Sequence, residues 1–554
     1  MQKKLPAGSA DSRSELEAPQ RRQLLKGAAL ASLSGGLLAS TATSTAADQP
    51  AKATTLDAKL KQHIQNVVII YLENRSFNNL FANFPGLEKP LSGLSADAYL
   101  QKDRDGSVLP QLPKIWGGMV PRSQNIGGKQ YSIGEDKITG LPNAPFTLKD
   151  ETGKPLPESV ITRDLCHLFY QNQMQINGGK NDQFVAYGDS GALVMGYYGQ
   201  TSSHLGLWKV AEEYTLCDNF FMAAFGGSYL NHQFLISGRT PEYFHAATTA
   251  AKRKIAVTAD GPTGSRLALD PASPASALEG KPKYVNDGAI TPDGYAVNTM
   301  APPYQPSYVK PAPGGDPLLA DPADQSTLPP QTYDTIGDLL SRKGVSWAWY
   351  GAAWQAALEY RGGGEKPNFQ YHHQPFNYFQ QFAPGTAARA EHLRDGGTGD
   401  SPMSNRFLAD AAAGKLPAVT FYKPQGNLNL HAGYSDVESG DQHVTNILAH
   451  LKNSPQWKNM LVIITFDENG GWWDHVAPPK GDRWGPGSRI PAIIVSPFAK
   501  KKHVDHNFFD TTSILRFLTR RFDLPLLEGL QVRNAAFAAQ RALPPGDLTS
   551  TLKF

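Results

Sequence analysis

This sequence of 554 residues has few cysteines, a small net charge and no long apolar run. The two cysteines, Cys166 and Cys217, allow at most one disulfide between them, and the sequence leaves both a bridge and two free thiols open. A net charge of +3 gives no argument for a nucleic-acid partner. No run reaches the ~20 strongly apolar residues of a membrane-spanning helix. We therefore expect neither nucleic-acid binding nor a stable membrane anchor.

Glycine and proline are plentiful instead, with 52 and 42 residues, and they predict long irregular segments. Two such segments, residues 85–157 and 240–330, interrupt a pattern of strands and helices that otherwise runs along the whole chain. This alternation predicts one α/β domain with insertions. The pattern predicts strands near 66–72, 214–221, 345–350, 418–422, 461–466 and 491–496, and helices near 393–414, 440–451 and 511–521.

The first 47 residues have the pattern of an export signal. Arg21-Arg22 precedes a Gly- and Ala-rich run, Gly27–Ala39, and Ser44–Ala47 offers small residues for cleavage. The twin arginine is an address read by the twin-arginine export machinery, and a basic tail before a surface helix is the alternative. We expect a signal peptide over 1–47, a single domain over 48–554, and a periplasmic or secreted protein.

Two buried strands end in acidic and amide side chains. The run Leu461–Phe466 is followed by Asp467-Glu468, and Asn66–Leu72 is followed by Glu73-Asn74. In open α/β sheets, ligands bind at the carboxyl ends of the strands. Oxygen donors suit Ca²⁺, Mg²⁺ or Mn²⁺, and with nearby imidazoles also Zn²⁺ or Fe. Either pair of side chains alone is typical of a helix cap or an ion pair. The occurrence of such a pair after two buried strands predicts a divalent metal site.

Ser228 lies in a turn between a predicted strand and a helix, in the segment GGSYLNH. Such a turn exposes a nucleophile beside free backbone N–H groups, although serine is also a favoured helix N-cap. A metal ion beside this hydroxyl would lower its pKa and orient it. Imidazoles can bind phosphoryl oxygens and protonate a leaving group, and four histidines are candidates: His167, His372, His373 and His443.

Three ordered motifs carry a resemblance: LENRSFNNLFANFPG, GGSYLNHQFLISG and TFDENGGWWDHVAPP, with Asn177–Lys180 between the first two. Together they resemble the bacterial phosphoesterase family of secreted acid phosphatases and phosphatidylcholine-type phospholipases C. The resemblance covers nearly all of the chain after the signal. It implies an alkaline-phosphatase-like fold, with a central mixed, largely parallel β-sheet flanked by helices.

The resemblance also implies residue roles. It implies one divalent ion, held by Glu73, Asn74, Asp467, Glu468 and the nucleophile Ser228, and phosphoryl contacts from the four histidines. Ser228 would form a phosphoseryl intermediate that water hydrolyses. Asp474 and His475 would orient the loop behind the ion or serve the structure alone.

The sequence favours an acid phosphatase acting on small phosphate esters. The family's phospholipases carry extra repeats after the catalytic domain, and this chain ends soon after the helix near 511–521. The serine turn GGSYLNH also resembles that of the phosphatases. A phospholipase C acting on phospholipid head groups is the alternative, and an inactive binding protein on the same fold is the second.

Overall fold

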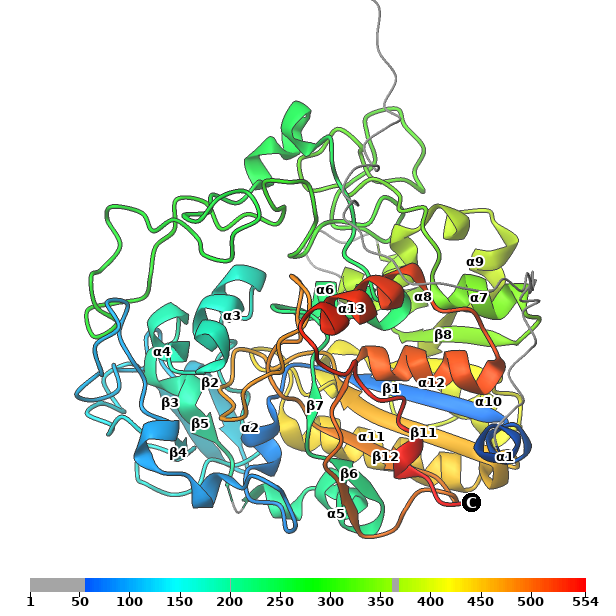
Figure 1. Ribbon diagram of the computed structural model, residues 1–554, viewed down its shortest axis with the longest axis horizontal. Coiled ribbons are helices and arrows are strands. Elements are labelled where there is room, and N and C mark those ends of the chain that lie inside the picture. The colour runs from blue at the N-terminus through cyan, green and yellow to red at the C-terminus, as the bar shows by residue number, and fades with distance from the viewer. Residues whose placement is uncertain (1–54, 200, 361–367) are drawn as a thin grey trace, which may run out of the picture. The chain divides into compact units, whose positions relative to one another are not determined.

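The core of the protein is an eight-stranded β-sheet with helices on both sides (Figure 1). The computed structural model describes residues 55–199, 201–360 and 368–554. The predicted export signal, residues 1–47, lies outside them. In sheet order the strands are β13 (His503–Asp505), β6 (Thr215–Cys217), β12 (Ala492–Val495), β11 (Met460–Phe466), β1 (Asn66–Leu72), β10 (Val419–Lys423), β8 (Trp347–Ala352) and β9 (Leu393–Gly397).

The sheet is mixed and largely parallel, as expected. Strands β11, β1, β10, β8 and β9 run parallel to one another, whereas β12 pairs antiparallel with both β11 and β6. Every residue of β1, β8, β10 and β11 is buried, which is why these strands read as almost unbroken apolar runs. The centre of the sheet therefore lies inside the main hydrophobic core.

Helices pack on this sheet in two groups. Helix α12 contacts α1 and α6, and α11 contacts α5 and α10. The helices are α1 (Thr55–His63), α2 (Phe77–Phe81), α3 (Phe169–Ile176), α4 (Phe184–Tyr187), α5 (Gly206–Glu213), α6 (Ser228–Ser237), α7 (Ile336–Arg342), α8 (Trp354–Glu359), α9 (Ala387–His392), α10 (Arg406–Ala412), α11 (Val437–Lys452), α12 (Thr512–Phe522) and α13 (Glu528–Ala539).

The two predicted insertions are mainly irregular. Residues 85–157 contain an antiparallel hairpin, β2 (Val120–Ile126) with β3 (Lys129–Ile133), which the sequence did not predict. Its neighbour β4 (Phe146–Thr147) pairs with β5 (Gly196–Tyr197). Residues 240–330 contain short 3₁₀ turns and isolated bridges, and they form the long green loops of Figure 1.

Two predicted elements were wrong in part. The predicted helix over 393–414 is instead the edge strand β9, a loop and the short helix α10. The predicted strand over 214–221 is broken into β6 and β7 (Phe220–Phe221), and β7 leaves the main sheet to pair with β14 (Phe509–Asp510). Both differences arise because strand pairing, and not local residue pattern, decides these segments.

Both cysteines are free thiols. Cys217 lies in β6 and is fully buried, and Cys166 lies in the segment before α3. The structure thus decides between the two possibilities that the sequence left open. Within the described ranges, no helix combines the length and apolar character needed to cross a membrane.

Candidate active site and metal-binding residues

Three neighbouring strands bring polar side chains to one edge of the sheet. Strands β1 and β11 are in register, with Leu72 opposite Phe466, so Glu73-Asn74 and Asp467-Glu468 emerge side by side. On the other side of β1, the parallel strand β10 ends in Lys423. The expected meeting of the two acidic motifs is therefore present in the structure.

Glycine allows these loops to approach closely. Gly470 has a φ of +60°, and a Cβ at this position would lie 2.3 Å from the carbonyl oxygen of Asn74. Asn74 itself adopts a positive φ of 60° at the end of β1. A larger residue at 470 would push the two loops apart, which explains the glycine after Asp467-Glu468-Asn469.

Ser228 is the first residue of α6, as the sequence predicted. Its Oγ lies 3.1 Å from Asn74 Oδ1 and 3.4 Å from Glu468 Oε1, so the hydroxyl can donate to either oxygen. The preceding Gly226 has a φ of +90°, and a Cβ there would lie 2.5 Å from the backbone of Phe169. The glycines of this turn therefore let the segment that carries His167 pass directly beside the serine.

The carboxylates of Asp467 and Glu468 are fully buried. Asp467 Oδ1 accepts hydrogen bonds from the backbone N–H groups of Asn74 and Glu468, at 3.0 and 2.7 Å, and Glu468 Oε2 accepts one from Gly470 at 2.5 Å. Burial raises the pKa of Asp467 to about 7, and the charge of Glu73 adds to this rise. Burial also raises the pKa of Glu468, against the opposing charge of His167.

These acids form an oxygen set that fits a cation. The set comprises Asn74 Oδ1, Ser228 Oγ and Glu468 Oε1, which lie in contact, together with Asp467 Oδ2 and Glu73 from the adjoining residues. Among the described residues, Asp467 Oδ2 is buried and has no hydrogen-bond partner. A buried anionic oxygen without a partner is costly, and a divalent ion would both bind it and return the raised pKa values to a range where the acids are ionised. The donors are all oxygen, which favours a hard cation.

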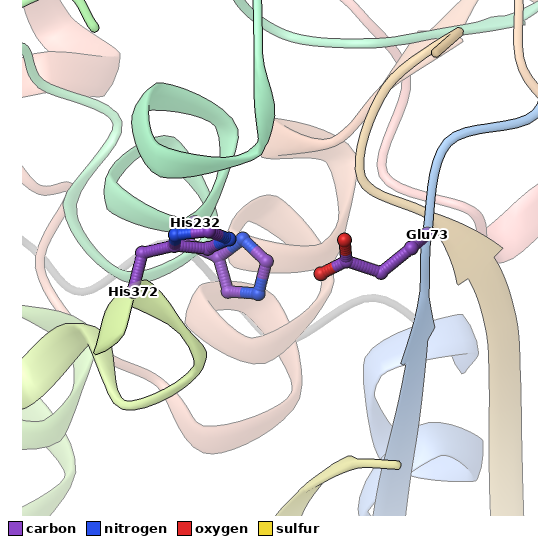
Figure 2. Close-up of side chains that lie close together, drawn as sticks. All are labelled: Glu73, His232 and His372. Carbon is purple, nitrogen blue, oxygen red and sulfur yellow. The ribbon is translucent and has the colours of Figure 1, made fainter. Parts of the chain in front are cut away.

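The carboxylate of Glu73 contacts a lysine and a group of imidazoles. Its Oε1 lies 2.5 Å from Lys423 Nζ and 2.6 Å from His373 Nε2. Burial would raise the pKa of Glu73, but the ammonium of Lys423 and the imidazole of His373 hold it well below its usual range. Figure 2 shows the carboxylate directed from β1 toward His232 of α6 and toward His372.

His232 and His372 are buried and neutral. His232 Nδ1 lies 2.8 Å from the carbonyl oxygen of Ser228, one helical turn earlier, while Nε2 of both histidines lacks a hydrogen-bond partner in the part of the chain that the structure describes. Burial lowers the pKa of both imidazoles, and the charge of Lys423 acts in the same direction. Ligand atoms of Glu73, His232 and His372 lie within 4.8 Å of one another.

His167 and His431 complete the ring of imidazoles around the serine. His167 Nε2 lies 3.4 Å from Asn74 Nδ2 and 3.7 Å from Glu468 Oε1, and its Nδ1 bonds the Leu165 carbonyl at 2.6 Å. Burial opposes a charge on this ring, but Glu468 and Asp164 raise the pKa of His167 to about 9. His431 stacks on Tyr434, and its Nε2 lies 3.8 Å from Glu73 Oε2.

A cavity of about 290 Å³ opens onto Ser228, His167, His372 and His431. It adjoins a groove of about 870 Å³, and both are lined by Asp164, His167, Leu168 and Tyr434. The insertion 240–330 contributes residues 297–299 to the smaller cavity. A small chamber at the serine thus leads into a space large enough for a bulky substituent.

The structure does not bring His443 to this site. Its Nδ1 is paired with Asp400 and its Nε2 lies 2.9 Å from the hydroxyl of Tyr422. It lines neither the cavity nor the groove. The other predicted histidines, His167, His372 and His373, all lie at the site.

Asp474 and His475 lie behind the site and contact helix α2, not Ser228. Asp474 accepts hydrogen bonds from the backbone of Asn78 and from Arg489 Nε, both at 3.0 Å. The two ring nitrogens of His475 lie 3.0 Å from Asn78 Oδ1 and from the Lys89 carbonyl. These contacts fix the loop that follows Glu468 and make no contact with Ser228.

Sequence reasoning missed three residues of the site: His232, Lys423 and His431. His232 follows Ser228 by four residues, so a helix starting at Ser228 places both on one face. Lys423 is the last residue of a buried parallel strand, and Glu73 and Asp467 directly follow two other such strands. The position at a strand end could therefore have identified Lys423 from the sequence. His431 lies in an irregular loop between β10 and α11, where nothing in the local pattern marks it.

Comparison with known proteins places this site in a family. A sequence model of the Phosphoesterase family matches residues 64–525. Phospholipase C B of Mycobacterium tuberculosis is 23% identical over 528 residues, which cover 89% of this chain and 78% of that protein. A non-specific phospholipase C6 of Arabidopsis thaliana is 35% identical over 120 residues, covering 17% of this chain and 23% of that protein.

Solved structures give weaker matches. An alkaline phosphatase superfamily protein of Vibrio parahaemolyticus is 14% identical, covers 37% of this chain and 50% of that chain, and has a TM-score of 0.23. Murine ectonucleotide pyrophosphatase/phosphodiesterase 5 is 9% identical, covers 63% and 94%, and has a TM-score of 0.27. Because these TM-scores are low, the fold assignment rests on the sheet itself. The family match spans most of the chain, and this protein therefore belongs to the Phosphoesterase family.

Proposed function

We propose that the protein hydrolyses phosphodiesters of the phospholipid type through a covalent intermediate on Ser228. The observation that carries the proposal is the position of the Ser228 hydroxyl, which lies between the buried acids and the imidazoles and faces the cavity. Both relatives named above are phospholipases C, and the alignment with phospholipase C B of Mycobacterium tuberculosis covers 89% of this chain. The adjoining groove offers room for a diacylglycerol-sized leaving group.

One divalent ion would be held by Asn74, Ser228, Asp467 and Glu468, with Glu73 close by. The fit rests on the partnerless buried oxygen of Asp467 and on the oxygen chemistry of the donors. When bound, the ion supplies positive charge that favours the serine alkoxide and the charged transition state. Ca²⁺, Mg²⁺, Mn²⁺, Zn²⁺ and Fe all remain compatible with these ligands.

The chain's own residues account for the remaining chemistry. The Ser228 hydroxyl, which faces the cavity, releases its proton to solvent as its oxygen bonds to phosphorus. The unpartnered Nε2 of His372, which lines the cavity, is placed to bind a phosphoryl oxygen. As the ester bond to the leaving group breaks, His167, which is cationic, donates a proton to the departing oxygen.

Water then attacks the phosphorus of the serine ester, with neutral His167 now accepting its proton. The bond from phosphorus to Ser228 Oγ breaks, and the serine oxygen takes up a proton from solvent. For a phosphatidylcholine-type substrate, the products are a diacylglycerol and the phosphorylated head group. Each proton given up in the first half is regained in the second, so the protein ends as it began.

A phosphomonoesterase is the second candidate. It is favoured by the serine turn GGSYLNH, which resembles that of the family's acid phosphatases. Purified enzyme should be assayed on p-nitrophenylphosphorylcholine, phosphatidylcholine and p-nitrophenyl phosphate. We expect higher kcat/KM for the two choline esters, and a clear preference for p-nitrophenyl phosphate would reverse the order of the candidates. An inactive binding protein would turn over none of the three.

We further propose that residues 1–47 direct export by the twin-arginine machinery and that residues 48–554 form the catalytic domain. The support is the Arg21-Arg22 pair with the apolar run and the small residues that follow it. Replacing the pair by two lysines should retain the protein in the cytoplasm. Unchanged export of that variant, measured by cell fractionation, would exclude this route.

A further inference from the structure

Two positions suited to a cation lie side by side at the carboxyl end of the sheet. The first is the oxygen set of Asn74, Ser228, Asp467 and Glu468. The second consists of Glu73, His232 and His372, whose ligand atoms lie within 4.8 Å of one another (Figure 2). Two imidazoles and one carboxylate form a donor set typical of Zn²⁺. By donor chemistry alone, the second position would also hold a metal ion.

Lys423 changes this conclusion. Its Nζ lies 2.5 Å from Glu73 Oε1, the carboxylate that the second position would need, and both side chains are fully buried. The same oxygen also contacts His373 Nε2 at 2.6 Å. The ammonium also lies over the ring of Tyr71, whose centroid is 5.3 Å from Nζ. The ammonium of Lys423 is therefore already paired with the carboxylate that a second metal ion would need.

The position of the ammonium leads to the same result. A second divalent ion at Glu73, His232 and His372 would lie next to the fully buried ammonium of Lys423, and the two positive charges would repel each other strongly at this depth.

We propose that Lys423 takes the place of a second metal ion beside Glu73, so that the protein binds one divalent ion per chain. This inference rests on the proposed function, because it requires an ion at the oxygen set. It makes Lys423 a positioning residue: it holds Glu73 ionised and in place, and it prevents metal binding by His232 and His372. Unlike a metal ion, the ammonium of Lys423 is part of the chain, so it need not be bound from solution and cannot dissociate.

Metal stoichiometry tests this inference without reference to activity. The wild-type protein, K423M and K423R should each be stripped with a chelator, equilibrated with Zn²⁺ or Mn²⁺, freed of excess metal and measured by elemental analysis. We expect one ion per chain for the wild type and for K423R, and two Zn²⁺ ions for K423M. Removing the lysine charge should tighten the second site by about 100-fold or more. The double variant K423M/H232Q should return to one ion, which locates the extra ion at His232.

Each outcome is decisive. Two ions in the wild type, or one ion in a folded K423M, would overturn the role of Lys423 while leaving the proposed function intact. No ion in the wild type would instead refute the oxygen set, and with it the proposed function. If K423M does not fold, the wild-type stoichiometry and the Zn²⁺ titration of K423Q decide, because both measure the same second site.

Discussion

The buried pair of Asp474 and Arg489 offers a test of whether the end of the FDENGGWWDH motif serves structure or catalysis. Both side chains are 1% exposed, and Arg489 Nε donates to Asp474 Oδ1 at 3.0 Å. Asp474 also accepts hydrogen bonds from the backbone of Asn78 and Val476, at 3.0 and 2.8 Å. In Asp474→Asn, the guanidinium loses its counter-charge, and the new amide N–H₂ must face one of these donors.

The expected cost follows from this geometry. Breaking a buried ion pair by removing one partner costs roughly 3–5 kcal/mol, because the remaining charge stays buried without compensation. We expect Asp474→Asn to lower the free energy of unfolding by about this amount. Asp474 makes no contact with Ser228, so turnover per folded molecule should stay within a few-fold of wild type. Thermal or urea unfolding measures the first quantity, and kcat normalised to folded protein measures the second.

The exposed pair of Asp334 and Arg342 provides a matched control. The same two functional groups meet there in a two-fold hydrogen bond, at 2.9 and 2.5 Å, but the side chains are 55% and 56% exposed. Asp334→Asn should therefore cost at most about 1 kcal/mol. The reasoning fails if Asp474→Asn is no more destabilising than Asp334→Asn. A stable Asp474→Asn protein without turnover would assign Asp474 to catalysis.

The remaining predictions concern the ion, His443 and the two thiols. Asp467→Asn removes one ligand charge and should weaken binding of the divalent ion by ~100-fold, measured by titration of metal-free protein; unchanged affinity would place the ion elsewhere. His443→Asn should cost about 1–3 kcal/mol of stability, because it breaks the contacts with Asp400 and Tyr422, yet leave turnover unchanged; lost turnover in a folded protein would return His443 to the site. Burial raises the pKa of Cys166 and Cys217 above the usual range, so both thiols should react more slowly with a thiol reagent near pH 8 in the native protein than after unfolding. Fast reaction of native protein, or fewer than two thiols after unfolding, would contradict this.

The site residues that directly follow strongly apolar strands could be predicted from the sequence. Asn66–Leu72 and Met460–Phe466 are buried on both faces, so their apolar runs are unmistakable and the acids after them mark the sheet edge. Ser228 could be predicted because glycines and a helix start surround it. The residues that face these groups across the site were harder, since His431 comes from an irregular loop whose position depends on the complete fold.

Elements at the margin of the fold were predicted least well. Strand β9 has the sequence LRDGG, which has no apolar alternation and becomes a strand because it pairs with the edge of β8. Helix α13 buries Arg533, whose charge is neutralised by Asp510 and Asp482. A buried arginine disrupts the apolar periodicity by which a helix is recognised, although its partners were present in the sequence.

The covalent intermediate on Ser228 is the central claim, and trapping it is the most direct test. Wild-type enzyme mixed with p-nitrophenylphosphorylcholine and quenched in acid should yield one modified peptide, with the phosphoryl group and its choline ester on Ser228. Ser228→Ala should show no adduct and no measurable turnover while retaining its fold. An adduct on another residue, or turnover by Ser228→Ala at the wild-type rate, would contradict the account.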